Sequence, residues 1–550
     1  MTECPIWDRP HPAADGRPGP LPVLLYGLTV LGPVLALIAG LLLGDGPPPA
    51  TWPELVLPTG RRLALWLRSI GLATSVAVCG LTVGTLVALR LRRHTRWAGW
   101  PWLFAMLAAL PPMTHALAWS WVLARTNLFL RGAGMQALPT SGWLIAGWVQ
   151  FTWLVPLAVA VSLVAVDAVP TDLLEAAHLL HGSVHPLMRV LLPLAGPLLL
   201  AGGGVLFLLS LLDYGIPSIF QVNVLALDVF ADFSVHGQAD RALLVSVPLL
   251  AATVGAITLS QGRLRDAAMA PPVHGRKAVT TERWPRWLVA LSTGAVAIVM
   301  PAVLGPIVSL AAQVGSWQQL SAVLDGGRGE IVYSFGVSLA AALLSLPLAA
   351  IAAQRIVGGT PLGRAWWLAV TLPMALPGPL VGIGLIRLWN SPVIAFTSVY
   401  GSRWMPVLAA LARYVPLGAL VMTAALRRTD PSLIDAARVL QASRRRRLVL
   451  VHLPMLAPGL LAAGAVVFCL TLGELSATLL VAAPGHPTLS MRIYNYLHYG
   501  ASDTVAGLTL AMTALVLTLG AITVLVQTLW ARLTDIDPQP GVPVSGDSAR

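Results

Sequence analysis

Runs of about 20 consecutive apolar residues recur along the whole chain, and this pattern constrains the fold more than any other feature of the sequence. Each run is long enough to cross a bilayer as an α-helix, because a helix rises about 1.5 Å per residue. Hydrophobic residues make up 56% of the 550 residues, and charged residues only 11%. The sequence therefore predicts an all-α polytopic membrane protein rather than a soluble multidomain chain.

The apolar runs predict about twelve transmembrane helices, six in each part of the chain. The first six are expected near residues 21–43, 67–89, 99–124, 142–166, 195–219 and 241–260. The second six are expected near residues 287–312, 331–353, 365–388, 404–426, 456–482 and 504–530. Arginine-rich loops alternate with loops poor in Lys and Arg, so the positive-inside rule places both termini in the cytoplasm.

The net charge of +12 fits loops that orient a membrane protein, and no nucleic-acid partner is expected. The three cysteines are too scattered for a disulfide framework or a zinc site. His178, His181 and His185 have helical spacing, but Gly182 and Pro186 interrupt the helix, so no metal site is expected. The chain has no phosphate-binding G-x-x-x-x-G-K-[ST] loop and no nucleophile–base constellation, so we do not expect an enzyme or a bound cofactor.

The two parts of the chain resemble each other, with a nearly constant offset of 260 or 261 residues. Pro156 matches Pro416 at an offset of 260, and Pro193 matches Pro454 at 261. Earlier in each half, LPPM at 110–113 pairs loosely with LPM at 372–374. Because six spans separate the copies, the repeat is parallel rather than inverted.

The predicted organisation therefore has five parts. They are a disordered cytoplasmic tail at 1–20, a first half at 21–260, a cytoplasmic linker at 261–286, a second half at 287–530 and a cytoplasmic tail at 531–550. No cleavable signal peptide is expected.

A loop between the fourth and fifth spans occurs in both halves, on the cytoplasmic side. The first copy is VPTDLLEAAHLLHGSVHPLMRVLLP at 169–193, and the second lies within RTDPSLIDAARVLQASRRRRLVLVHLP at 428–454. Each begins with a helix-start signal, continues with two alanines and ends at Leu-Pro. Small alanine side chains let a helix approach another protein closely, so both loops are candidate docking sites.

This pattern resembles the EAA loop of type I ABC importer permeases, which docks on a separate ATPase. The residues that match or replace the motif are Glu175, Ala176, Ala177 and Gly182 in the first copy, and Asp435, Ala436, Ala437 and Gln441 in the second. The glycine of the motif is displaced in the first copy and replaced by Gln441 in the second. The resemblance implies a type I ABC importer fold in two fused six-helix halves.

Asp213 and Glu474 lie in mainly apolar sequence, each twenty residues after the proline of its Leu-Pro pair. Ionisable groups at such positions are costly unless they face a protein interior or a water-filled path. We therefore expect Asp213, the adjacent Tyr214 and Glu474 to be pathway or gate residues. The alternative is that each acid ends its span, solvated or paired with a helix terminus.

Among fused permeases of this type, the chain is most similar to the iron(III) transport family. The segment GELSATLLVAAPGHPTLSMRIYNYL at 473–497 carries this resemblance. It implies a multi-pass permease of the bacterial inner membrane that imports ferric iron, with thiamine, phosphonate, polyamine or sulfate as alternative substrates. Its partners would be two copies of an ATPase, which bind ATP and magnesium, an extracytoplasmic binding protein and the lipid bilayer. The alternative class is a single-chain, ion-coupled secondary transporter.

Overall fold

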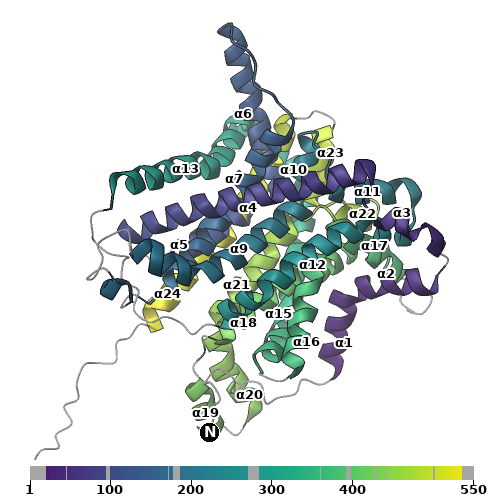
Figure 1. The fold of residues 1–550 in the computed structure, drawn as a ribbon. Coiled ribbons are helices and arrows are strands. Elements are labelled where there is room, and N and C mark those ends of the chain that lie inside the picture. Colours follow the sequence, from purple (N-terminus) through teal and green to yellow (C-terminus); the bar gives the residue numbers. More distant parts are fainter. Residues whose placement is uncertain are drawn as a thin grey trace, which may run out of the picture.

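A computed structural model describes residues 20–44, 46–94, 99–170, 173–177, 186–269, 284–358, 361–391, 398–427, 429, 431–440, 443–498 and 502–534. Within these ranges the regular elements are all helical (Figure 1). The predicted all-α membrane fold is confirmed.

The helices follow the same order in both halves. The first half contains α1 (Pro20–Tyr26), η3 (Gly27–Leu31), α2 (Gly32–Leu43), η4 (Pro49–Thr51), α3 (Trp52–Val56), α4 (Gly60–His94), α5 (Trp100–Ala108), α6 (Pro112–Gly132), α7 (Trp143–Asp167), η5 (Leu187–Leu191), α9 (Leu192–Leu212), α10 (Gly215–Ile219), α11 (Leu225–His236) and α12 (Ala239–Met269). The second half contains α13 (Arg286–Val314), α14 (Trp317–Gly326), α15 (Arg328–Val357), α16 (Pro361–Thr371), η6 (Leu372–Ala375), α17 (Gly378–Trp389), α18 (Met405–Arg427), α19 (Pro431–Leu440), α20 (Arg444–Arg447), η7 (Leu448–His452), α21 (Leu453–Leu472), α22 (Thr478–Val481), α23 (Leu489–His498) and α24 (Ser502–Thr534).

Ten of the described helices are long and apolar enough to cross a membrane, and two bent pairs bring the total to twelve. The bent pairs are α5 with α6, at 76°, and the α16 segment with α17, at 107°. The bends occur in the third span of each half, so the predicted number of spans is confirmed when each pair counts as one. Two of the twelve spans are therefore interrupted by a sharp bend, which apolar composition alone does not indicate.

The fifth span of each half begins earlier than expected. The sequence placed these spans at 195–219 and 456–482, but the helices run over Leu187–Leu212 and Arg445–Leu472. A π-helical turn precedes each Leu-Pro pair, because Pro193 and Pro454 lack the N–H that an ordinary helical turn would use. The helix thus continues through the Leu-Pro pair instead of starting after it.

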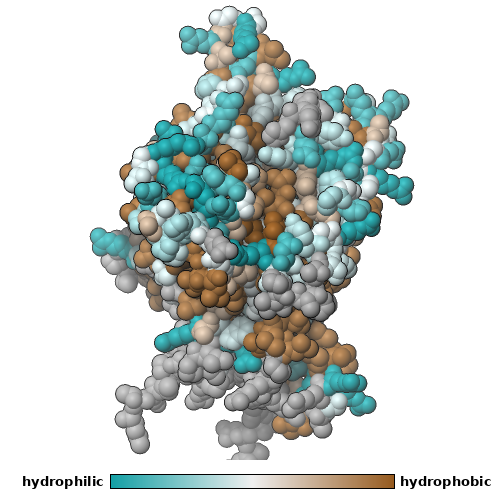
Figure 2. Space-filling view, turned by 90° about the vertical axis from the view of Figure 1, so that its right-hand side faces the viewer, coloured by the Kyte–Doolittle hydropathy of each residue, from teal (hydrophilic) through white to brown (hydrophobic). Residues whose placement is uncertain are grey.

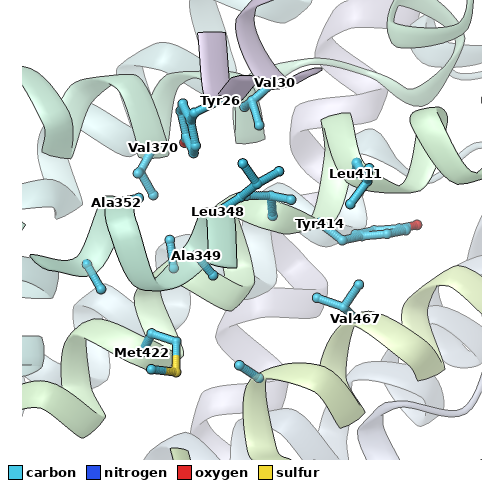
Figure 3. Packing of buried hydrophobic residues seen from close by; sticks show 14 of the residues in the cluster. Tyr26, Val30, Leu348, Ala349, Ala352, Val370, Leu411, Tyr414, Met422 and Val467 are labelled. Atoms are coloured by element: carbon cyan, nitrogen blue, oxygen red, sulfur yellow. The ribbon is translucent and has the colours of Figure 1, made fainter. Parts of the chain in front are cut away.

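The first spans of the two halves are exchanged. The α1–η3–α2 segment packs mainly on α15, α17 and α18 of the second half, and α13 packs on α4, α6 and α7 of the first half as well as on α24 of its own half. Tyr26 and Val30 accordingly belong to a second-half core cluster with Leu348 and Val370 (Figure 3). The Tyr26 hydroxyl donates to the Ala369 carbonyl at 3.3 Å. Each half therefore holds the first span of the other.

Short helices collect at one end of the molecule. Helices α3, α11 and α22 lie together on the right-hand side of Figure 1. Figure 2 views this side and shows hydrophilic residues around a central hydrophobic patch. We call this the outer end, because the arginine-rich loops predicted to be cytoplasmic follow the opposite ends of the spans.

Close packing of α4 on α7 depends on Gly84. A Cβ atom there would lie 2.7 Å from the Ala158 carbonyl carbon and 2.9 Å from the Val159 nitrogen, and backbone atoms cannot move aside. We expect Gly84→Ala to lower the free energy of unfolding by about 1–3 kcal/mol, because the added methyl group overpacks the contact. At Gly71 on the same helix, the nearest atom would be Trp143 at 3.7 Å, so Gly71→Ala should be neutral or stabilising by up to about 1 kcal/mol. Thermal unfolding midpoints in detergent test the contrast, and an equal or higher midpoint for Gly84→Ala than for Gly71→Ala would contradict it.

Candidate coupling loops and a polar cluster between the halves

The first predicted coupling loop is described over residues 173–177, which are helical. Glu175 and Ala176 are exposed, and Ala177 is partly buried. Leu174 is 2% exposed and belongs to the core cluster of the neighbouring span ends, so it anchors the helix. Gly182 lies outside the described residues.

The second predicted coupling loop forms α19, which projects at the lower edge of Figure 1. Ala436 is exposed and Ala437 is buried. Leu433, Val439 and Leu440 are 53%, 85% and 80% exposed, so this short helix presents apolar side chains away from the body of the protein. The side chain of Asp435 and residue Gln441 lie outside the described residues.

Asp213 and Glu474 occupy the same structural position in the two halves. Each follows the last turn of the fifth span, and each accepts hydrogen bonds from the start of the next short helix. Asp213 accepts from the Gly215 and Ile216 N–H groups at 3.1 and 3.3 Å. Glu474 accepts from the Ala477 N–H group at 2.7 Å. Each acid therefore lies at the end of its span and accepts a hydrogen bond from the backbone that leads into the next short helix.

The side-chain partners of the two acids differ in charge. In the first half, Gln150 of α7 donates to Asp213 at 3.0 Å and accepts from the Ser210 hydroxyl at 2.7 Å. In the second half, Arg413 of α18 forms an ion pair with Glu474, and the Tyr414 hydroxyl donates to the same carboxylate. The acid is thus bound by a neutral amide in the first half and by a cationic guanidinium in the second.

The acids also lie close to the interface between the halves. The Tyr214 hydroxyl of the first half faces Ser476 and lies near Glu474 and Arg413 of the second half. It is buried and makes no hydrogen bond of normal geometry within the described ranges. A Cβ atom on Gly473 would lie 2.9 Å from Pro111 of the first half, so the two backbones approach closely beside Glu474.

The breaks in the two bent spans adjoin this cluster. Pro111 and Pro377 precede α6 and α17 with nearly identical backbone angles. The structural partner of Leu110-Pro111-Pro112 is therefore Leu376-Pro377-Gly378, and the pairing of LPPM with residues 372–374 was wrong. Trp153 donates to the Leu110 carbonyl at 3.1 Å. Arg413, which corresponds to Trp153 in the second half at an offset of 260 residues, packs against Gly378.

At the outer end, the halves carry an ion pair in the same register with opposite polarity. Arg62, the third residue of α4, pairs with Asp228, the fourth residue of α11, at 3.8 Å. Glu330, the third residue of α15, pairs with Arg492, the fourth residue of α23. The fold of the outer end is therefore repeated, while its charge pattern is not.

Arg413 and Gln150 were not among the residues selected from the sequence. Arg413 could have been found, because it is an arginine inside an apolar span, where an ionisable group needs a partner. Gln150 gives a weaker signal, since an amide in an apolar span often bonds to the backbone. Within the described residues, no three His, Cys, Asp or Glu side chains form a potential metal site, and the three histidines at 178–185 lie outside those residues.

Comparison with known proteins places the second half among transport permeases. Residues 345–535 match the family described as "Binding-protein-dependent transport system inner membrane component". A Salmonella typhimurium protein named for 2-aminoethylphosphonate transport, permease PhnV, is 30% identical over 28% of this chain and 57% of its own length. The Escherichia coli putrescine transport system permease PotI is 25% identical over 34% of this chain and 66% of its own length.

The chain thus spans little more than half of the PhnV length. The matched family and these relatives are transport permeases rather than enzymes, which confirms that expectation for the present chain. The family and the apolar helices together indicate a multi-pass inner-membrane protein. None of these comparisons supports iron(III) specifically.

Proposed function

We propose that this chain is the membrane-spanning subunit of an ATP-driven importer and that it moves a small solute from a binding protein into the cytoplasm. The observation that carries the proposal is the duplicated short helix between the fourth and fifth spans, in a chain whose second half matches a binding-protein-dependent permease family. In this proposal, residues 173–177 and α19 dock on two copies of a separate ATPase. ATP and magnesium bind to that ATPase and not to this chain.

The shape and chemistry of α19 support docking. Its exposed leucines and valine would cost free energy in water, and they sit beside exposed Arg445 and Arg446. An apolar helix next to cationic side chains fits a hydrophobic groove with an acidic rim. Such a short lever, joined directly to the fifth span, would pass movement of the ATPase to the membrane helices.

The polar cluster between the halves is the proposed gate. Tyr214 reaches from the first half toward the Arg413–Glu474 pair of the second, so separation of the halves would part these groups. The outer end would receive the binding protein, and the termini would lie in the cytoplasm.

Two substrate classes are proposed for the same pathway. Ferric iron rests on the resemblance of residues 473–497 to iron(III) permeases. A solute with a primary amine rests on the relatives, because 2-aminoethylphosphonate and putrescine are both amines. Uptake by cells expressing the complete system, measured with ⁵⁵Fe(III) and with labelled putrescine or 2-aminoethylphosphonate, separates the two classes.

Affinity purification in mild detergent tests the function. The tagged chain is expected to recover an ATPase at about two copies per chain, and charge reversal in both coupling loops should abolish this recovery. A chain that purifies alone in several detergents, yet transports solute on an ion gradient, would instead establish a secondary transporter.

A further inference from the structure

An apolar groove of about 400 Å³ runs along the membrane-facing surface near the ends of three spans. Its walls come from α4 and the start of the fifth span in the first half, and from α13 of the second half. The lining residues include Thr82, Leu86 and Leu89 of α4, Leu187 and Met188 of the fifth span, and Trp287 and Leu291 of α13. Helix α4 packs against both α9 and α13 (Figure 1). The groove therefore lies across a junction between the halves.

The groove is open to the surroundings of the protein rather than enclosed by it. Thr82 is exposed, and Met188, Trp287 and Leu291 are 49%, 47% and 53% exposed. In a membrane protein these side chains face lipid, and an exposed tryptophan at the first turn of a span is typical of the membrane–water interface. Hydrocarbon is therefore the environment in which this groove exists.

One end of the groove is cationic. Thr82, Leu86 and Leu89 form a stripe on α4, and Arg93 continues that stripe one turn further. The Arg93 guanidinium lies 4.8 Å from the centroid of the Trp284 ring, which precedes the groove residues of α13 by one turn. Arg189, exposed, follows groove residues Leu187 and Met188. Neither arginine has a carboxylate partner among the residues that the structure describes.

We propose that this groove binds one anionic phospholipid, with an acyl chain along the apolar walls and the phosphate at Arg93 and Arg189. An apolar channel that ends in cationic side chains at the interface is complementary to an anionic lipid. A zwitterionic lipid would fill the same walls but would leave the positive charge unneutralised. The bound lipid contacts both halves and stabilises their junction at α4 and α13.

Native mass spectrometry of the purified chain tests the site. Phosphatidylglycerol and phosphatidylcholine with the same acyl chains are added separately. The number of lipid molecules that stay bound to each chain is measured as collisional activation is increased. One phosphatidylglycerol is expected to be retained in preference to phosphatidylcholine. The double variant Arg93→Gln with Arg189→Gln should weaken phosphatidylglycerol binding by roughly fivefold per arginine. Arg131→Gln is the matched control, because Arg131 is an exposed arginine on α6, which contributes no residue to the groove.

A second pair of variants tests the walls without altering any charge. Thr82→Trp fills the groove and is expected to abolish retention of both lipids. Val78→Trp, one turn away on the same helix and exposed outside the groove, should leave it intact. Glycerol 3-phosphate should not displace the lipid, because it has no acyl chain.

Three results would overturn the proposal. They are equal retention of the two lipids by the unaltered chain, unchanged phosphatidylglycerol retention after loss of both arginines, and equal effects of Thr82→Trp and Val78→Trp. If loss of the arginines prevents folding, the tryptophan pair decides the question alone, since it leaves every arginine in place.

Discussion

Replacing Glu474 with alanine is expected to lower the free energy of unfolding by about 3–5 kcal/mol, because the guanidinium of Arg413 would stay buried without its carboxylate. The Glu474 side chain is 2% exposed and that of Arg413 19%, so water can solvate neither group well. The variant also removes the acceptor of the Ala477 N–H group beside α22, which adds about 1 kcal/mol. The thermal unfolding midpoint of the purified chain in detergent measures the loss.

A double-mutant cycle separates the ion pair from general damage to the site. Arg413→Met combined with Glu474→Leu should be more stable than either single variant, because no unpaired charge remains. Asp213→Ala is the matched control, because its side-chain partner Gln150 is neutral, and it should cost only about 1–3 kcal/mol. If Asp213→Ala and Glu474→Ala lower the free energy of unfolding equally, the charge difference between the halves has no energetic consequence.

Reversing charge in both coupling loops is expected to reduce transport by at least about tenfold, which corresponds to a loss of about 1.4 kcal/mol of docking free energy. The variant is Glu175→Arg with Asp435→Arg, and ATPase recovery and solute uptake are measured in the same preparation. Each substitution removes the acidic residue near the start of a docking helix and places a bulky cation there, where the helix dipole disfavours positive charge.

The control for this variant reverses two exposed acids of the outer end, Glu54 and Asp325. It changes the net charge by the same amount and should leave ATPase recovery unaltered. Normal import and normal ATPase recovery by the Glu175 and Asp435 variant would remove the coupling role from these loops.

The number of spans and the repeat could be predicted from the sequence, because apolar length and residue spacing are local properties. The first and last residues of the fifth spans could not be predicted from the sequence. Leu192-Pro193 and Leu453-Pro454 look like loop ends in sequence, but a π-helical turn upstream allows the helix to continue through them. The spans also end earlier than expected, at Asp213 and Glu474, whose carboxylates accept hydrogen bonds from the backbone that follows.

The candidate site was predictable in part for a different reason. Asp213 and Glu474 stand out as acids in apolar sequence, and Tyr214 follows directly. Their partners Gln150 and Arg413 lie about 60 residues away, at positions that do not correspond between the halves. Long-range pairing of this kind depends on how the fourth and fifth spans pack, which residue spacing does not reveal.

The exchange of the first spans has a mechanical consequence. If the halves rotate relative to each other, α2 must travel with the second half and α13 with the first, because each is packed on the opposite body. The change in angle then falls on the connectors that lead back, residues 46–59 with α3 and residues 315–327 with α14. These two connectors at the outer end would act as a pair of hinges. Stiffening either connector would limit the relative rotation of both halves.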